Sequence, residues 1–387
     1  MPEIVKLGQI VEGTTGTRNP TKAPDNNFIY VDVAAVDNAE KRIVGARSIL
    51  GSEAPSRARK VIRTNDILVS TVRPNLNAVA LVPADLDDQV ASTGFCVLRA
   101  SAKVLPEYLF FFVRSRKFVD GLSSLVAGAM YPAVSDSQVL DQSLPLPPLP
   151  EQHRIADLLS RAEGIVRLRR EAEKKAAELI PALFLDMFGD PATNPRGWAR
   201  KSIAETGASI RYGIGQPLPQ KADGLPFLRA TNVKRGKISR TGLVFIDPDA
   251  NPKKRNPPLD RSDIIVVRSG AYTGDVAQVG AEYEGAIAGY DLVLHPSPNH
   301  LSEFVANYLL LPYVQVNLIG GHKIRAAQPH LNATQLGGIV IPIPPLGLQQ
   351  KFADSIDQIA SIQFQQAAAI VKAQATFDAL LAQTFSR

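Results

Sequence analysis

The residues of this 387-residue chain that could act in catalysis are not spaced as a catalytic or metal-binding set. Glu173-Lys174-Lys175 could supply the acid and base of a nuclease, but no nearby Pro-Asp partner precedes it, so a solvated helix face is the simpler interpretation. Gly213-Ile214-Gly215 lacks the third glycine of a dinucleotide-binding loop and is predicted to be a turn. The histidines show no metal-ligand spacing with Cys96 or with paired carboxylates: they are His153, His295, His300, His322 and His330.

A third segment, Asn256-Pro257-Pro258-Leu259, approaches the Asn-Pro-Pro-aromatic signature of amino-methyltransferases. Leu259 replaces the aromatic ring that would stack on the target base, and no glycine-rich strand-turn-helix precedes the segment. A short motif without its structural context indicates a plain loop. The sequence therefore predicts no catalytic residue and no metal ligand, and the chain is expected not to be an enzyme.

Basic and hydrogen-bonding side chains in loops favour a polyanion as the partner. The net charge is +6, and residues 196–345 hold 17 basic against 11 acidic side chains. Candidates to neutralise DNA phosphates are Arg57, Arg59, Lys60 and Arg63, and further along Lys234, Arg235, Lys237, Arg240, Lys253, Lys254 and Arg255. Candidates to contact base edges, in or near predicted turns, are Arg73, Asn75, Asn77, Arg268, Tyr272, Gln328 and His330.

The elements that must position these residues occur twice. A proline-rich segment, which we call a proline box, occurs once at Pro145-Leu146-Pro147-Pro148-Leu149-Pro150-Glu151-Gln152 and again at Ile341-Pro342-Ile343-Pro344-Pro345-Leu346-Gly347-Leu348-Gln349-Gln350. About forty residues that are predicted to be helical follow each box. Aligning Pro148 with Pro345 sets an offset of 197 in residue number, and this repeat offset also matches Asp66 with Asp263. Proline begins helices well and cannot continue them, so each box marks a boundary between strand and helix. The chain is interpreted as a tandem duplication.

Apolar residues recur at steps of three and four in both helices, as at Ile155, Leu159, Ala162 and Val166. Such a stripe must be buried, and the other copy is the nearest partner, so we expect an antiparallel coiled coil within the chain. Within the two globular parts, a helix is predicted over 105–119 and 301–311, and Gly51–Arg63 is one of several long polar loops. Short apolar strands are predicted over 28–33, 66–72, 78–82, 225–229, 263–268, 275–279 and 286–288.

These boxes, the Asp66-Ile67-Leu68-Val69 strand and the segment Gln328-Pro329-His330-Leu331-Asn332 resemble the DNA specificity subunit of type I restriction-modification systems. The resemblance covers nearly the whole chain and implies an α+β fold. It implies target-recognition domains at 1–149 and 191–345 and helical spacers at 150–190 and 346–387. One departure is Leu348, which stands where the first box has Glu151.

The resemblance also implies the partners. They are double-stranded DNA with a bipartite target, two methyltransferase subunits that use S-adenosylmethionine, and motor-nuclease subunits that use ATP and Mg²⁺. The chain itself would hold no cofactor. Two other functions remain open from the residues alone, a single-chain DNA-modifying enzyme without obvious motifs and a coiled-coil scaffold that does not bind DNA. One cysteine, no charged-then-apolar leader and no long apolar run predict a cytoplasmic protein without membrane contact.

Overall fold

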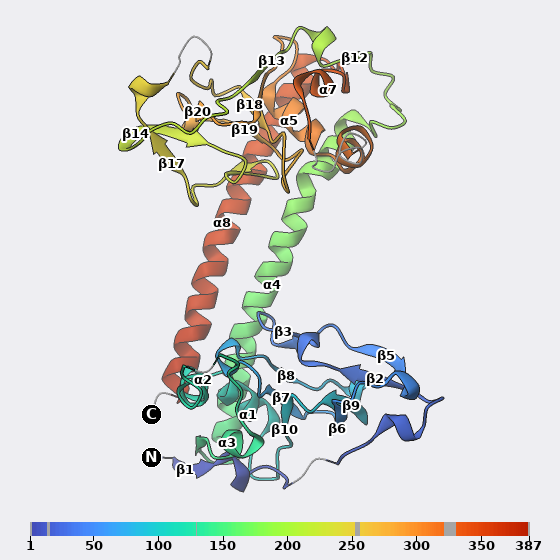
Figure 1. Ribbon diagram of the computed structural model, residues 1–387, viewed down its shortest axis with the longest axis vertical. Coiled ribbons are helices and arrows are strands. Elements are labelled where there is room, and N and C mark those ends of the chain that lie inside the picture. The colour runs from blue at the N-terminus through green and yellow to red at the C-terminus, as the bar shows by residue number, and fades with distance from the viewer. Residues whose placement is uncertain (1, 14–15, 129, 252–255, 321–329, 386–387) are drawn as a thin grey trace. The chain divides into compact units, whose positions relative to one another are not determined.

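The computed structural model describes residues 2–13, 16–128, 130–251, 256–320 and 330–385, and it contains two compact units (Figure 1). Unit 1 comprises Met1–Arg170 together with Ala368–Arg387, and unit 2 comprises Glu171–Ala367. Each unit therefore contains part of both long helices, α4 (Leu149–Phe188) and α8 (Leu346–Phe385). None of the described helices combines the length and hydropathy needed to cross a membrane.

Four sheets form the β-rich part of unit 1, in the orders β5-β2-β9-β6, β10-β7-β8, β1-β11 and β3-β4. All four residues of β7 are buried, as the uncharged Ile-Leu-Val-Ser sequence allows. The strands are β1 Glu3–Lys6, β2 Asn27–Val31, β3 Val36–Asp37, β4 Arg42–Ile43, β5 Arg47–Leu50, β6 Ala58–Ile62, β7 Ile67–Ser70, β8 Val79–Leu81, β9 Gln89–Ser92, β10 Phe95–Leu98 and β11 Ser143–Leu146.

Two sequence predictions for unit 1 are wrong in detail. The helix predicted over 105–119 is two helices, α1 (Pro106–Val113) and α2 (Arg116–Ser124), because Ser115 caps a new helix by accepting the Phe118 N–H. The predicted loop Gly51–Arg63 contains β6, which pairs with β9. The third helix of the unit is α3 (Asp136–Leu140).

Unit 2 repeats this plan with the sheets β13-β21-β18-β19, β17-β14-β20, β12-β22 and β15-β16. Its shorter helices include α5 (Ser302–Leu310), the π-helix Val314–Ile319 and α7 (Ala333–Gly337). Its strands are β12 Arg200–Ser202, β13 Ser209–Tyr212, β14 Gln220–Leu228, β15 Val233–Lys234, β16 Lys237–Ile238, β17 Val244–Ile246, β18 Ile264–Val266, β19 Val276–Gln278, β20 Ile287–Ala288, β21 Leu292–His295 and β22 Val340–Pro342.

The repeat offset found in the sequence relates corresponding elements of the two units. The parallel strand pair joins Tyr30 to Val90 in unit 1 and Phe227 to Ile287 in unit 2, and both partners of the second pair are displaced from the first by this offset. Helices α4 and α8 both have 40 residues, and their first residues are separated by the same offset. The tandem duplication thus extends to strand register.

A glutamine in each box ties the start of its helix to the unit it follows. Gln152 Oε1 accepts the Leu105 N–H at 2.9 Å, and its Nε2 donates to the Pro147 carbonyl at 2.8 Å. Gln349 makes the matching bonds with the Leu301 N–H and the Pro344 carbonyl, both at 2.9 Å. Both glutamines are buried, so these bonds fix the helix start in each unit.

The two long helices pack antiparallel, as both units show. In unit 1, Arg170 donates to Gln374 at 2.9 Å, and α8 adds Phe377, Leu381 and Phe385 to the core. In unit 2, Gln363 donates to the Ala176 carbonyl at 2.8 Å. The prediction of an α+β fold with two β-rich units and a pair of antiparallel helices is confirmed.

The end of α4 plays the same part in unit 2 as the end of α8 plays in unit 1. Phe184 and Phe188 pack against Phe304 and Phe352, with ring centroids 4.8–5.4 Å apart. Each core is therefore completed by the last residues of the long helix that starts in the other unit.

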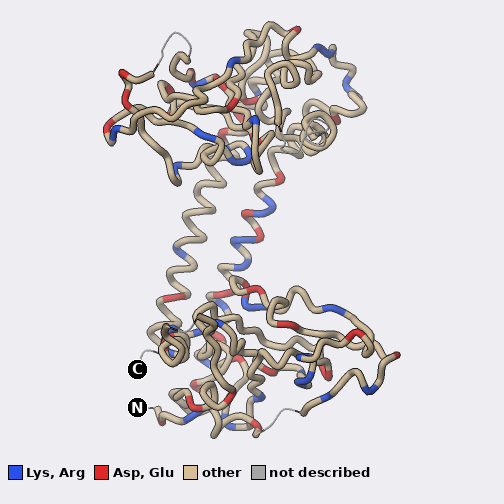
Figure 2. The backbone as a smooth tube through the Cα atoms, in the orientation of Figure 1, with Lys and Arg blue, Asp and Glu red and all other residues tan. Residues whose placement is uncertain are grey.

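Along the middle of the helices, charges of both signs follow one another in α4, whereas α8 carries few (Figure 2).

Candidate nucleic-acid interface

An arginine and two tyrosines from three neighbouring segments of unit 2 meet at one end of the β13-β21-β18-β19 sheet. The register pairs both Tyr212 and Val266 with Leu292, so the residues just after β18 and just before β21 lie beside Tyr212. The guanidinium carbon of Arg268 lies 4.6 Å from the ring centroid of Tyr212 and 4.3 Å from that of Tyr290. Cation–π contacts at these distances hold the guanidinium over the two rings. We call Tyr212, Arg268 and Tyr290 the arginine stack.

His330 extends the arginine stack. Ser269 and His330 form an isolated antiparallel bridge, and the Leu331 N–H donates to the Arg268 carbonyl at 2.7 Å. Arg268 Nη2 lies 2.9 Å from His330 Nε2. Because a guanidinium carries only donors, Nε2 must accept, which places the proton of a neutral His330 on Nδ1. The structure thus brings together two predicted site residues that are 62 positions apart.

A buried carboxylate lies beside the arginine stack. Asp291 is 2% exposed, and its Oδ1 accepts the backbone N–H of Arg268 at 3.2 Å. Burial raises the pKa of Asp291 to about 6, while the Arg268 N–H and the Arg268 charge act in the opposite direction. Among the described residues, Asp291 Oδ2 and Arg268 Nε are both buried without a hydrogen-bond partner.

Two glycines let the segments that carry the tyrosines approach each other. A Cβ on Gly213 would lie 1.7 Å from the Gly289 carbonyl oxygen, so only glycine fits there. The Gly213 N–H donates to the Asp291 carbonyl at 2.9 Å. Tyr212 and Tyr290 are not among the site residues predicted from the sequence, although each tyrosine adjoins one of these glycines. The residues around Gly213 predicted only a turn, because the approach involves residues far apart in the chain.

Three predicted phosphate contacts share one hairpin of unit 2. Lys234 and Lys237 pair across β15 and β16, and the turn between them has φ of 39° at Arg235 and 87° at Gly236. We call Lys234, Arg235 and Lys237 the hairpin cations; all three are exposed. Arg240 is paired with Glu282 at 2.9 Å, and Tyr272, in the β18–β19 loop, is 43% exposed. The predicted contacts Lys253, Lys254, Arg255 and Gln328 lie outside the described residues.

The predicted phosphate contacts of unit 1 follow β6 and its flanks. Arg57 and Arg63 are exposed, whereas Arg59 and Lys60 are half-buried on the strand. Arg59 Nη1 donates to the neighbouring Ala58 carbonyl at 2.7 Å. Lys60 forms an ion pair with Asp136, and only 16% of its side chain is exposed. Lys60 is therefore the least available of the four for DNA.

The predicted base contacts of unit 1 lie in the turn after β7. Arg73 and Asn77 flank the 3-10 turn Pro74–Leu76 in left-handed conformation, with φ of 49° and 48°. Asn77 Nδ2 donates to the Val113 carbonyl at 2.8 Å, so this amide anchors the turn. Arg73 and Asn75 are exposed.

Unit 1 has no arginine stack at the matching positions. Its isolated bridge between Val72 and Ala133 matches the Ser269–His330 bridge at the repeat offset. The residues that correspond to Arg268, Tyr290 and His330 are Thr71, Thr93 and Ala133. The two units therefore present different side chains at equivalent places.

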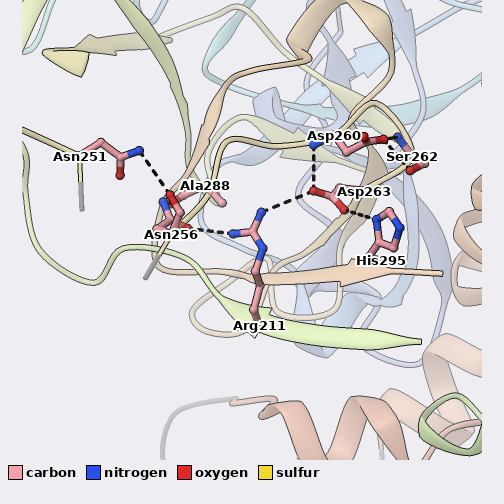
Figure 3. A network of polar contacts seen from close by, with 8 residues as sticks. All are labelled: Arg211, Asn251, Asn256, Asp260, Ser262, Asp263, Ala288 and His295. Carbon is pink, nitrogen blue, oxygen red and sulfur yellow. Dashed lines mark hydrogen bonds and ion pairs between the residues drawn. The ribbon is translucent and has the colours of Figure 1, made fainter. Parts of the chain in front are cut away.

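A second polar network lies in unit 2 around Asp263 (Figure 3). Asp263 accepts from Arg211 at 3.5 Å and lies 2.9 Å from His295 Nδ1. Arg211 also donates to Asn256 Oδ1 at 2.9 Å, and Asn256 is 2% exposed. Leu259 packs in a core cluster. Asn256 and Leu259 thus anchor both ends of the Asn-Pro-Pro-Leu segment to the fold, and the segment lies in a loop, as predicted. Within the described part of the chain, no three His, Cys, Asp or Glu side chains are grouped to hold a metal ion.

A family model described as "Type I restriction modification DNA specificity domain" matches residues 2–178 and 218–370. The MjaIX specificity subunit of Methanocaldococcus jannaschii is 20% identical, over 90% of this chain and 84% of that protein. The HindI specificity subunit of Haemophilus influenzae is 29% identical over 36% of this chain, and the match spans only 31% of that protein's length.

Solved structures extend the similarity to the whole chain. A chain from work on complex assembly and conformational transition of the type I R-M system is 30% identical, with a TM-score of 0.66 over 99% of this chain and 97% of that one. The S subunit of a type I system from M. genitalium shares the fold at 15% identity, with a TM-score of 0.52 over 99% and 96%.

Proposed function

Because this chain belongs to the family of type I restriction-modification DNA specificity subunits, we propose that its two units read the two halves of a bipartite target in double-stranded DNA. As a specificity subunit it is non-catalytic, recognises the DNA target and assembles into a complex with other subunits. We assign residues 1–149 and 191–345 to two target-recognition domains, and 150–190 and 346–387 to the helical spacers.

The arginine stack is the observation that carries this proposal. Arg268 is half-buried among two tyrosine rings, His330 and Asp291, and no carboxylate pairs with its terminal nitrogens among the contacts of the described residues. A guanidinium held in a fixed plane is suited to bidentate hydrogen bonding with a base edge. In unit 1 the exposed Arg73 and Asn75 take this role in the proposal.

Phosphate contacts supply affinity without sequence preference. The exposed hairpin cations of unit 2 and the exposed Arg57 and Arg63 of unit 1 are the best placed. Lys60, which is paired with Asp136, contributes less.

We propose two methyltransferase subunits and motor-nuclease subunits as the partners, with S-adenosylmethionine, ATP and Mg²⁺ bound by those subunits. Exposed apolar side chains on the long helices support docking there: Phe364 in α8 is 78% exposed, and Leu168 in α4 is 61% exposed. Phe364→Ser should reduce co-purification of the methyltransferase subunit. Val316→Ser is the matched control, because Val316 is similarly exposed, at 68%, but belongs to the short π-helix Val314–Ile319 and not to a long helix. Equal recovery of the partner with both variants would contradict docking at Phe364.

The test of DNA reading is filter binding by the complex of this chain with its methyltransferase subunits. Arg268→Ala should cost about 1–3 kcal/mol on cognate DNA and leave binding to scrambled DNA unchanged. Equal losses on both DNAs would make Arg268 a phosphate contact or a structural residue.

A further inference from the structure

The arginine stack and His330 present hydrogen-bond donors to a ligand. The guanidinium has five N–H donors and no acceptor. One Nη2 donor is used on His330 Nε2, and the buried Nε faces the interior, so the remaining donors lie on the two terminal nitrogens. With its Nε2 occupied as an acceptor, a neutral His330 presents the Nδ1 proton, which is also a donor. The adjacent carboxylate of Asp291 is 2% exposed and does not face a ligand.

This donor set discriminates among the four bases. In the major groove guanine presents two neighbouring acceptors, N7 and O6, whereas adenine and cytosine each present an amino donor and thymine pairs one acceptor with a methyl group. Two donors of a planar guanidinium match N7 and O6 and would oppose an amino group. We propose that Arg268 and His330 read a guanine in the half-site bound by unit 2, an inference that rests on the proposed function.

Tyr212 and Tyr290 are positioning residues in this proposal. Their rings lie 4.6 and 4.3 Å from the guanidinium carbon, which restricts the plane in which its donors point. The close approach of Gly213 to Gly289 fixes the spacing of the two segments that carry the rings. The buried, unpartnered Arg268 Nε and Asp291 Oδ2 cost folding free energy. An arrangement that is unfavourable for stability yet holds one side chain in place is typical of a functional site.

Guanine reading by an arginine held between two tyrosine rings belongs to unit 2 only. Thr71, Thr93 and Ala133 occupy the matching positions of unit 1 and provide neither a cation nor an aromatic ring. The bipartite target is therefore expected to be asymmetric.

The experiment combines base analogues with protein variants in the full complex. Methylome sequencing first identifies the target, and each guanine of both half-sites is then replaced singly by 7-deazaguanine, which lacks the N7 acceptor. The wild-type complex should lose about tenfold in affinity at one guanine of one half-site. Arg268→Ala should bind the normal target more weakly and show no further loss with that analogue. Tyr290→Leu should weaken cognate binding while keeping the salt dependence, because the phosphate contacts remain.

Two results would overturn the proposal. One is a wild-type loss at every analogue that is the same in Arg268→Ala, and the other is a target without guanine in either half-site. If Arg268→Ala unfolds, as thermal denaturation would reveal, Arg268→Lys replaces it, since lysine keeps the charge but cannot bind N7 and O6 together. A wild-type complex that binds all DNA sequences equally would instead refute the proposed function itself.

Discussion

A fragment that ends at Asp190 should form a two-fold symmetric dimer. The cut removes the end of α8, including Phe377, Leu381 and Phe385, which lie in the core of unit 1. The fragment keeps the end of its own α4, where Ile180, Phe184 and Phe188 occupy the equivalent positions at the repeat offset. Since those α4 residues lose their partners in unit 2, they are free to fill the vacated core of a second copy.

The magnitude follows from the side chains removed. The three lost residues are 1–9% exposed, and removing a buried Phe or Leu side chain costs about 2–5 kcal/mol each. A total on the order of 10 kcal/mol matches the entire stability of a typical domain, so the isolated fragment has little stability as a monomer. Recovery of about 8 kcal/mol on pairing corresponds to a dissociation constant of about 1 μM. The fragment should therefore be dimeric at tens of micromolar.

Sedimentation of the 1–190 fragment measures its state, and a methylation assay with the partner subunit then reads its target. Antiparallel pairing of identical helices creates a two-fold axis, so the methylated site should be palindromic. Within the fragment, Phe188→Ala should prevent dimerisation, whereas Leu168→Ala, at a side chain that is 61% exposed, should not. A folded monomer at tens of micromolar, or a non-palindromic methylated site, would refute the equivalence of the two helix ends.

Three further predictions concern unit 2. Replacing all three hairpin cations by alanine should weaken binding to cognate and scrambled DNA alike and flatten the slope of log affinity against log salt by about three units; a loss confined to cognate DNA would contradict their assignment to phosphates. Asp291 has a folded pKa of about 6 against 3.8 in the unfolded chain, so its ionisation destabilises the fold by about 3 kcal/mol above pH 6, and the penalty disappears as the pH falls toward 4. Asp291→Asn should therefore raise the free energy of unfolding at pH 7 more than at pH 4.5 in urea titrations, and an equal change at both values would disprove this account. Gly213→Ala should lower the free energy of unfolding by about 1–3 kcal/mol, because the added Cβ clashes with Gly289. The control is Gly164→Ala, in a helix where an added Cβ has nothing within 4 Å, and it should raise the free energy of unfolding by up to about 1 kcal/mol. An unchanged free energy of unfolding for Gly213→Ala would show that the close approach is not needed.

The sequence alone determined the features that depend on local chemistry. Each proline box specifies where a helix begins, because proline fixes its own backbone angle near the helical value and lacks only an N–H that the first turn does not use. The repetition of the box sets the repeat offset, and the starts of α4 and α8 are separated by that same offset. Periodic apolar residues predicted the two long helices and their pairing, and the same motifs carried the family resemblance.

Only the tertiary structure decided which side chains meet. Arg268 and His330 were single candidates in the sequence, and their contact arises from the Ser269–His330 bridge at the sheet end. Tyr212 and Tyr290 carried no signal of their own, since their position beside Arg268 follows from the register of β13, β21 and β18. The pairing of Lys60 with Asp136 likewise depends on two segments 76 residues apart. Such contacts are set by how strands align across the chain, and neither propensity nor periodicity of a local segment contains that information.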